Sequence, residues 1–223
     1  MLGSPTTTTS SGTGSKRAIT GGGGGIDAAP LQKHSQGMDQ FFTSLRGQEG
    51  LNILDFAGAS QANISFITEL GHRISSEDFV RSLELAFGTG PEFYENQSDP
   101  ERAEQFLSES LNFPPEHFDG VMIWDALQFL NPALLQPMVD KLYEILRPNS
   151  LMLAFFHADE KATQFPLYTY RIADQKTLIL NPRGMRTRGQ FFNNRGLEKL
   201  FSRFQSVKFF LTRDSLREII VRR

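Results

Sequence analysis

The clearest pattern of apolar and polar positions runs through residues 51–76. Residues 51–56 form a short apolar run, residues 57–62 are small or polar, and the apolar positions that follow recur at helical spacing. This order predicts a strand, a tight turn and a helix. Gly71 then ends the helix, and residues 72–76 form a second strand.

The ends of these two strands hold the first candidate site residues. Asp55 closes the first strand and the turn after it runs to Gln61, whereas Glu77 and Asp78 follow the second strand. Ligands of open parallel sheets bind outside the carboxyl ends of the strands. We therefore expect the turn and the acidic pair to border one site.

The remainder of the chain alternates between helical and strand patterns. Helices are predicted at 38–45, 79–87, 99–111, 132–146 and 194–204, and strands at 119–123, 151–156, 206–211 and 216–221. An inserted hairpin is predicted at about 166–182, and no strand is predicted between residues 87 and 119. Pro137 lies about a turn and a half into its helix, so we expect some distortion there.

The segment ILDFAGASQANISFI resembles the first motif of class I S-adenosylmethionine-dependent methyltransferases, in which an apolar strand ends in an acid before a glycine-rich turn. Aligned on Asp55, the chain has Ala57, Ala59 and Gln61 at the three usual glycine positions and keeps Gly58 between them. Glycine permits positive φ and close approach of a ligand to the backbone. The resemblance implies an α/β fold, a Rossmann-like doubly wound, mostly parallel sheet with an antiparallel C-terminal hairpin, and S-adenosylmethionine as cofactor.

A second segment, LNFPPEHFDGVMIWDALQFL, resembles the fourth-strand region of the same family and brings Trp124 and Asp125 to the site edge of the sheet. His157 follows the next strand. Some methyl acceptors need a general base, and Asp125 and His157 are the candidates for it. The alternatives are core packing for Trp124 and a cap on the following turn for Asp125.

The resemblance places Asp55, Ala57, Gly58, Ala59, Gln61, Glu77, Asp78 and Trp124 around the cofactor. Asp55 is expected to order the turn by accepting backbone N–H bonds. We assign Glu77 to the ribose hydroxyls and Asp78 to the cap of the helix at 79–87. Gln61 either reaches the amino-acid end of the cofactor or fills a vacated site.

The composition of the chain indicates its domain boundaries and argues against some kinds of site. Residues 1–37 are low in complexity and predict a flexible tail, leaving a methyltransferase-like domain at 38–223. The chain has no cysteine, its four histidines lack ligand spacing, and no long apolar run predicts a membrane span. We thus expect no metal site and a cytoplasmic protein.

Charge is unevenly distributed along the chain. Residues 161–223 carry 14 Lys and Arg against 4 Asp and Glu, whereas residues 1–160 carry 9 against 21. Such asymmetry marks either a surface for an anionic partner or two halves that pair with each other, and we favour the second reading. The arginines near the inserted hairpin lack interleaved aromatic residues, which argues against nucleic acid as partner.

These patterns leave two functions open. One is methyl transfer from S-adenosylmethionine to an unidentified small-molecule or protein acceptor. The other is a non-catalytic relative that has lost the cofactor and acts as an interaction or scaffold protein. A site blocked by Ala59 and Gln61 would favour the second, and an open cleft between Glu77 and Trp124 the first.

Overall fold

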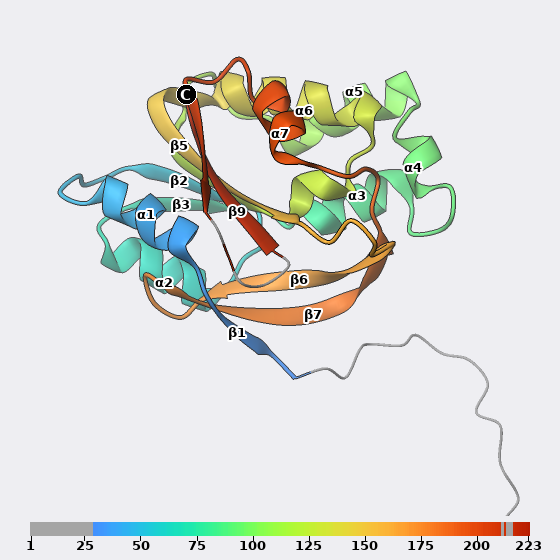
Figure 1. Cartoon of the computed structure of the whole chain (residues 1–223). Coiled ribbons are helices and arrows are strands. Elements are labelled where there is room, and N and C mark those ends of the chain that lie inside the picture. The colour runs from blue at the N-terminus through green and yellow to red at the C-terminus, as the bar shows by residue number, and fades with distance from the viewer. Residues whose placement is uncertain (1–28, 211, 213–215) are drawn as a thin grey trace, which may run out of the picture.

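The computed structural model describes residues 29–210, 212 and 216–223. Its main sheet has six strands in the order β3-β2-β4-β5-β9-β8 (Figure 1). The strands are β2 (Asn52–Asp55), β3 (Arg73–Ser76), β4 (Phe118–Trp124), β5 (Leu146–His157), β8 (Ser206–Phe210) and β9 (Leu216–Arg222). Neighbours from β3 to β5 are parallel, and β9 runs antiparallel to both β5 and β8. The predicted α/β class and the antiparallel C-terminal hairpin are confirmed.

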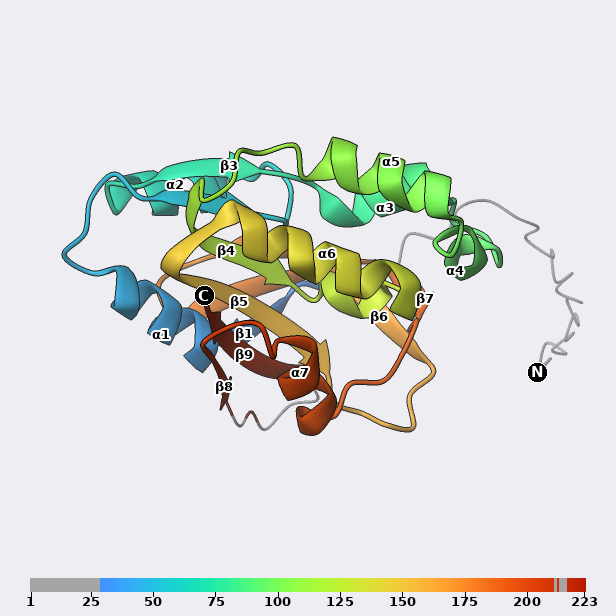
Figure 2. The ribbon, with the colours of Figure 1, turned by 90° about the horizontal axis from the view of Figure 1, so that it is seen from above.

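Helices cover both faces of this sheet. α5 (Pro100–Ser110), α6 (Pro132–Ile145) and α7 (Asn194–Leu200) lie on one side with α3 (Phe79–Phe87), and α1 (Gln36–Leu45) and α2 (Gln61–Glu69) lie on the other (Figures 1 and 2). Short elements, α4 (Phe93–Asn96) and the 3₁₀ turn η1 (Ala126–Phe129), join the larger ones. The chain therefore winds doubly around a central sheet, as the sequence predicts.

A second sheet of three strands, in the order β1-β7-β6, lies against the carboxyl ends of the first. The predicted hairpin supplies β6 (Gln164–Ile172) and β7 (Thr177–Thr187), and β1 (Leu31–His34) pairs antiparallel with β7. The predicted tail is thus too long, because residues 31–37 belong to β1 and the start of α1. The rest of that tail, residues 1–28, lies outside the described residues, as do residues 213–215 of the expected turn between the last two strands.

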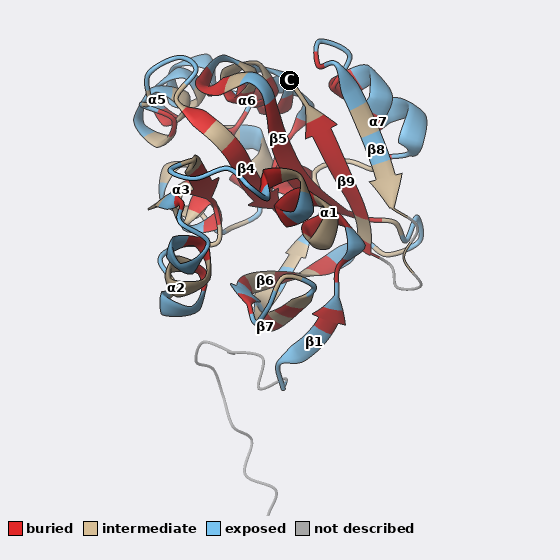
Figure 3. Ribbon diagram, turned by 90° about the vertical axis from the view of Figure 1, so that its left-hand side faces the viewer, coloured by how far each residue is buried: buried red, intermediate tan, exposed pale blue. Residues whose placement is uncertain are grey.

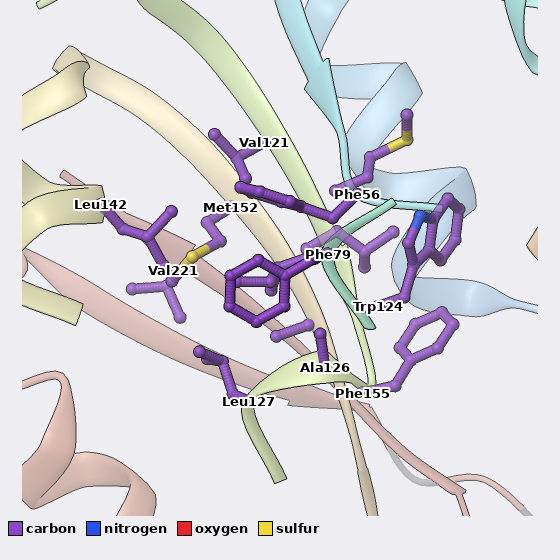
Figure 4. Packing of buried hydrophobic residues seen from close by; sticks show 14 of the residues in the cluster. Phe56, Phe79, Val121, Trp124, Ala126, Leu127, Leu142, Met152, Phe155 and Val221 are labelled. Atoms are coloured by element: carbon purple, nitrogen blue, oxygen red, sulfur yellow. The ribbon is translucent and has the colours of Figure 1, made fainter. Parts of the chain in front are cut away.

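The apolar core surrounds β4, β5 and β9, which Figure 3 shows buried along most of their length. Phe56 and Phe79 pack edge to face with ring centroids 5.2 Å apart, beside Val121 and Met152 (Figure 4). Burial of both faces agrees with the continuous apolar runs of the parallel strands.

Several boundaries differ from the prediction. β5 begins at Leu146, directly after α6, whereas the pattern predicted residue 151, and α7 ends at Leu200, before residue 204. Pro137 lies inside α6 without dividing it. α4 has only four residues and was not predicted, because one helical turn leaves no periodicity to detect.

Ion pairs join the acidic and the basic parts of the chain. Arg183 pairs with Asp78 at 3.0 Å and Arg186 with Glu84 at 2.7 Å, and Arg223 pairs with Glu116 at 3.1 Å. The reading in which the two halves pair with each other is confirmed for these charges. Among the described residues there is no group of side chains that could hold a metal ion, and no helix is long and apolar enough to cross a membrane.

Candidate functional site

Asp55 is the centre of the candidate site, at the carboxyl end of β2. Its side chain is fully buried. Oδ1 accepts hydrogen bonds from the Ala57 backbone N–H at 3.0 Å and from Trp124 Nε1 at 2.7 Å, and Oδ2 accepts one from Asn63 Nδ2 at 2.7 Å. Burial raises the pKa of Asp55 to about 6, although the three hydrogen-bond donors lower it. The carboxylate orders the turn, as predicted, and its bonds go to the protein's own groups.

The turn after Asp55 lies directly against the acidic pair. The Gly58 N–H donates to the Glu77 carbonyl at 3.0 Å, and Ala57 forms an isolated bridge with Asp78. Gly58 has φ +82°, and a Cβ there would lie 3.2 Å from Asp78 Cβ. Glycine at this position thus serves the close packing of turn and acid, as well as the left-handed backbone.

The two acids have different surroundings. Asp78 caps α3 by accepting from the Arg81 N–H at 3.1 Å and pairs with Arg183, so the predicted cap is confirmed. Glu77 is half-buried, which raises its pKa, and lines a cleft of about 510 Å³ between α3 and α5. Its assignment to a ribose stays a prediction.

Trp124 lies under the inserted hairpin. Its indole stacks on the ring of Tyr170 from β6, with centroids 4.9 Å apart and planes 5° from parallel. Phe155 contacts both rings at 5.7 and 5.8 Å. Trp124 is only 2% exposed and Tyr170 1%; Figure 4 shows Trp124 and Phe155 side by side at the ends of their strands. An open cleft between Glu77 and Trp124 would favour methyl transfer, but the surface at Trp124 is closed because Tyr170 covers it.

Asn63, on the first turn of α2, fixes the hairpin to this site. Besides its bond to Asp55, Nδ2 donates to the Tyr170 carbonyl at 3.1 Å, and Oδ1 accepts from the Ile172 N–H at 2.8 Å. The side chain is fully buried. One amide thus joins β2, α2 and β6.

Asp125 and His157 come together below the hairpin. His157 Nε2 lies 3.9 Å from Asp125 Oδ2, and the imidazole stacks on Phe165 of β6 at 4.4 Å. Gln128 links the two residues by accepting from the His157 N–H at 3.0 Å and donating to Asp125 at 3.4 Å. Burial raises the pKa of Asp125 to about 7, opposed by the neighbouring Tyr170 hydroxyl. The sequence correctly predicts that Asp125 and His157 lie close together at the ends of their strands, but both side chains are buried there.

Ala59 and Gln61, which the resemblance places around the cofactor, do not block the cofactor position. Both are exposed, and Gln61 donates to Ser65 within its own helix at 3.0 Å. The space above β2 and β4 is filled by Trp124 and Tyr170. The sequence offers one signal for Tyr170, an aromatic residue in an apolar hairpin strand, and none for the pairing of Asn63.

A Rossmann-like α/β sheet with polar residues at the carboxyl ends of its strands defines the class of fold. No family model matches the sequence, and no curated protein matches it. Among solved structures, the chain is similar to the Burkholderia thailandensis 1,6-didemethyltoxoflavin-N1-methyltransferase, crystallised with bound 1,6-didemethyltoxoflavin and S-adenosylhomocysteine: the two are 14% identical over 85% of this chain and 79% of that one, with a TM-score of 0.46.

Two further structures are similar at the same level. A SAM-dependent methyltransferase from Methanosarcina mazei is 13% identical over 82% of this chain and 96% of that one, with a TM-score of 0.48. A glycopeptide N-methyltransferase in complex with S-adenosylmethionine is 14% identical over 84% and 94%, with a TM-score of 0.44. Likeness of this degree concerns the fold and assigns neither cofactor nor acceptor to this chain.

Proposed function

We propose that this protein is a non-catalytic member of the methyltransferase-like folds and acts as an interaction module. The observation that carries this proposal is the stack of Tyr170 on Trp124 above a fully buried Asp55. A bound cofactor needs exposed donors and acceptors at the strand ends. Here the Asp55 carboxylate already accepts three hydrogen bonds from the chain. In this arrangement the residues present do not fit S-adenosylmethionine.

Opening the site would require the hairpin to leave. Six of its apolar or aromatic side chains are buried, namely Phe165, Leu167, Tyr170, Ile172, Leu178 and Leu180. At about 1.5–3 kcal/mol for each large side chain, exposing them costs about 9–18 kcal/mol. This reaches or exceeds the whole free energy of unfolding of an ordinary domain, about 5–15 kcal/mol. A ligand would have to prefer the open form roughly several million-fold to offset even the lower figure.

The second candidate is the methyl transfer that the sequence motifs imply, from S-adenosylmethionine to an unidentified small-molecule or protein acceptor. The observation in its favour is the position of Glu77, half-buried at the end of β3 beside a cleft of about 510 Å³. A carboxylate there is free to accept bonds from vicinal hydroxyls. Asp125 and His157 would be the candidate bases, and the hairpin would have to move for either to meet an acceptor.

Calorimetric titration with S-adenosylmethionine and S-adenosylhomocysteine separates the two candidates. We expect no heat of binding at ligand concentrations of about 1 mM, the weakest range that such a titration resolves. Micromolar binding that is lost in Glu77→Ala and kept in Glu198→Ala would overturn the non-catalytic proposal. Glu198→Ala is the matched control, because it also removes a carboxylate, which is exposed on α7 and does not line the cleft.

A further inference from the structure

β3 is an edge strand of the main sheet, with β2 on one side and no strand on the other among the described residues. The N–H groups of Arg73 and Glu77 donate to Leu51 and Asp55 on the β2 side, each at 2.8 Å. Because backbone polar groups of a strand alternate in direction, those of Ile74 and Ser76 point to the open side. Within the described chain they have no backbone partner there.

Two exposed apolar side chains lie close to this strand in the sequence. Of the four large apolar residues that are exposed in the described chain, Leu70 at the end of α2 and Leu85 on α3 lie on either side of β3 in the sequence, 42% and 78% exposed. The cleft lined by Glu77, Leu85 and Phe106 begins where β3 ends. An uncovered strand edge with apolar neighbours is the surface on which proteins add a strand from a partner.

We infer that the edge of β3 is a homodimer interface, in which β3 of a second copy pairs antiparallel about a two-fold axis at Ser75. The outward backbone N–H and C=O groups of Ile74 in one copy then bond to those of Ser76 in the other. By the two-fold symmetry this forms two hydrogen-bonded residue pairs. This register places Arg73 of each copy directly opposite Glu77 of the other. Two identical ion pairs follow, so the edge is complementary to itself in charge as well as in backbone bonding.

Leu70 supports the same arrangement. It precedes β3 by three positions, so antiparallel pairing carries Leu70 of the second copy past Glu77 toward the cleft that Leu85 and Phe106 line. The outer strand at the other end of the sheet, β8, carries Lys208 within its short span, a charge that protects an edge from pairing. β3 has no lysine or proline within its bounds.

Sedimentation velocity of the full chain tests this interface. We expect a dimer in the wild type, and a dissociation constant raised about tenfold or more in Arg73→Glu and in Glu77→Arg, because each change makes both cross-strand pairs repulsive. The double variant Arg73→Glu with Glu77→Arg restores opposite charges and should recover the dimer. Ile74→Pro removes one outward N–H and should give a folded monomer by circular dichroism.

A wild-type chain that stays monomeric at about 0.5 mM, a range that includes weak complexes, would overturn the inference. So would a dimer that persists in both charge reversals and in Ile74→Pro. The inference goes beyond the proposed function and does not depend on it, because cofactor binding is measured by titration heat and assembly by sedimentation.

Discussion

Replacing Asn63 by alanine tests whether one buried amide holds the hairpin on the site. The variant leaves three buried groups without the partners that Asn63 supplies: Asp55 Oδ2, the Tyr170 carbonyl and the Ile172 N–H. Each group left unsatisfied costs about 1–3 kcal/mol. Allowing for partial relaxation, we expect the free energy of unfolding to fall by about 3–5 kcal/mol.

Urea unfolding followed by circular dichroism measures this loss, and amide hydrogen exchange shows where it acts. At slopes of about 1–3 kcal/mol per molar urea, the midpoint should fall by more than about 1 M. Exchange should rise first in β6 and β7, because the hairpin loses two of its bonds to α2. Gln61→Ala on the same helix is the control and should change stability by less than about 0.5 kcal/mol. Equal stability of the two variants would refute the role given to Asn63.

Two further predictions concern the same contact. Tyr170→Ala should uncover Trp124, the one tryptophan of the chain, so that the tryptophan fluorescence shifts to the red and acrylamide quenches it more strongly. Tyr143→Ala, remote from the site, is the control and should leave the emission unchanged. An unshifted spectrum in Tyr170→Ala would contradict the stacking. Asp125 has a pKa of about 7 in the folded protein against an ordinary value of 3.8, so the folded form keeps a proton that the unfolded chain has released, and stability should fall as pH rises from about 4 to about 7. Asp125→Asn should remove much of the pH dependence of the urea midpoint between pH 5 and pH 8, and the remaining dependence should come from Asp55, whose pKa is also raised. An unchanged pH dependence in Asp125→Asn would refute the assignment.

Local patterns predict most of the fold because its elements are regular. The strand, turn and helix at Asp55 and the cap at Asp78 follow from spacing and residue type over a few positions. β1 was not predicted, because four residues with one buried side chain, Lys33, give no readable period, and their partner β7 lies far along the chain.

The filling of the site could not be predicted for a related reason. It depends on the stack of Tyr170 on Trp124 and on the bonds of Asn63 to β6, which join residues 46 and more than 100 positions apart. No local pattern encodes which residue of an inserted hairpin covers which strand end. From the sequence, the altered turn at Ala59 and Gln61 was the only visible candidate for blocking the site, and whether it did so stayed open.

The buried carboxylate of Glu218 bears on the order in which the chain folds. This residue of β9 accepts from the Ser35 hydroxyl and the Gly37 N–H and lies 3.1 Å from Lys33 Nζ. The segment at residues 33–37 is made before the strands of the main sheet, whereas its buried counter-charge, in β9, is made after the other five strands of that sheet. A ribosome-bound chain that ends before Glu218 would have to bury Lys33 without the carboxylate of Glu218, which is costly. The β1 segment, and the edge it forms on the hairpin sheet, should thus dock late, after the C-terminal strand has entered the main sheet.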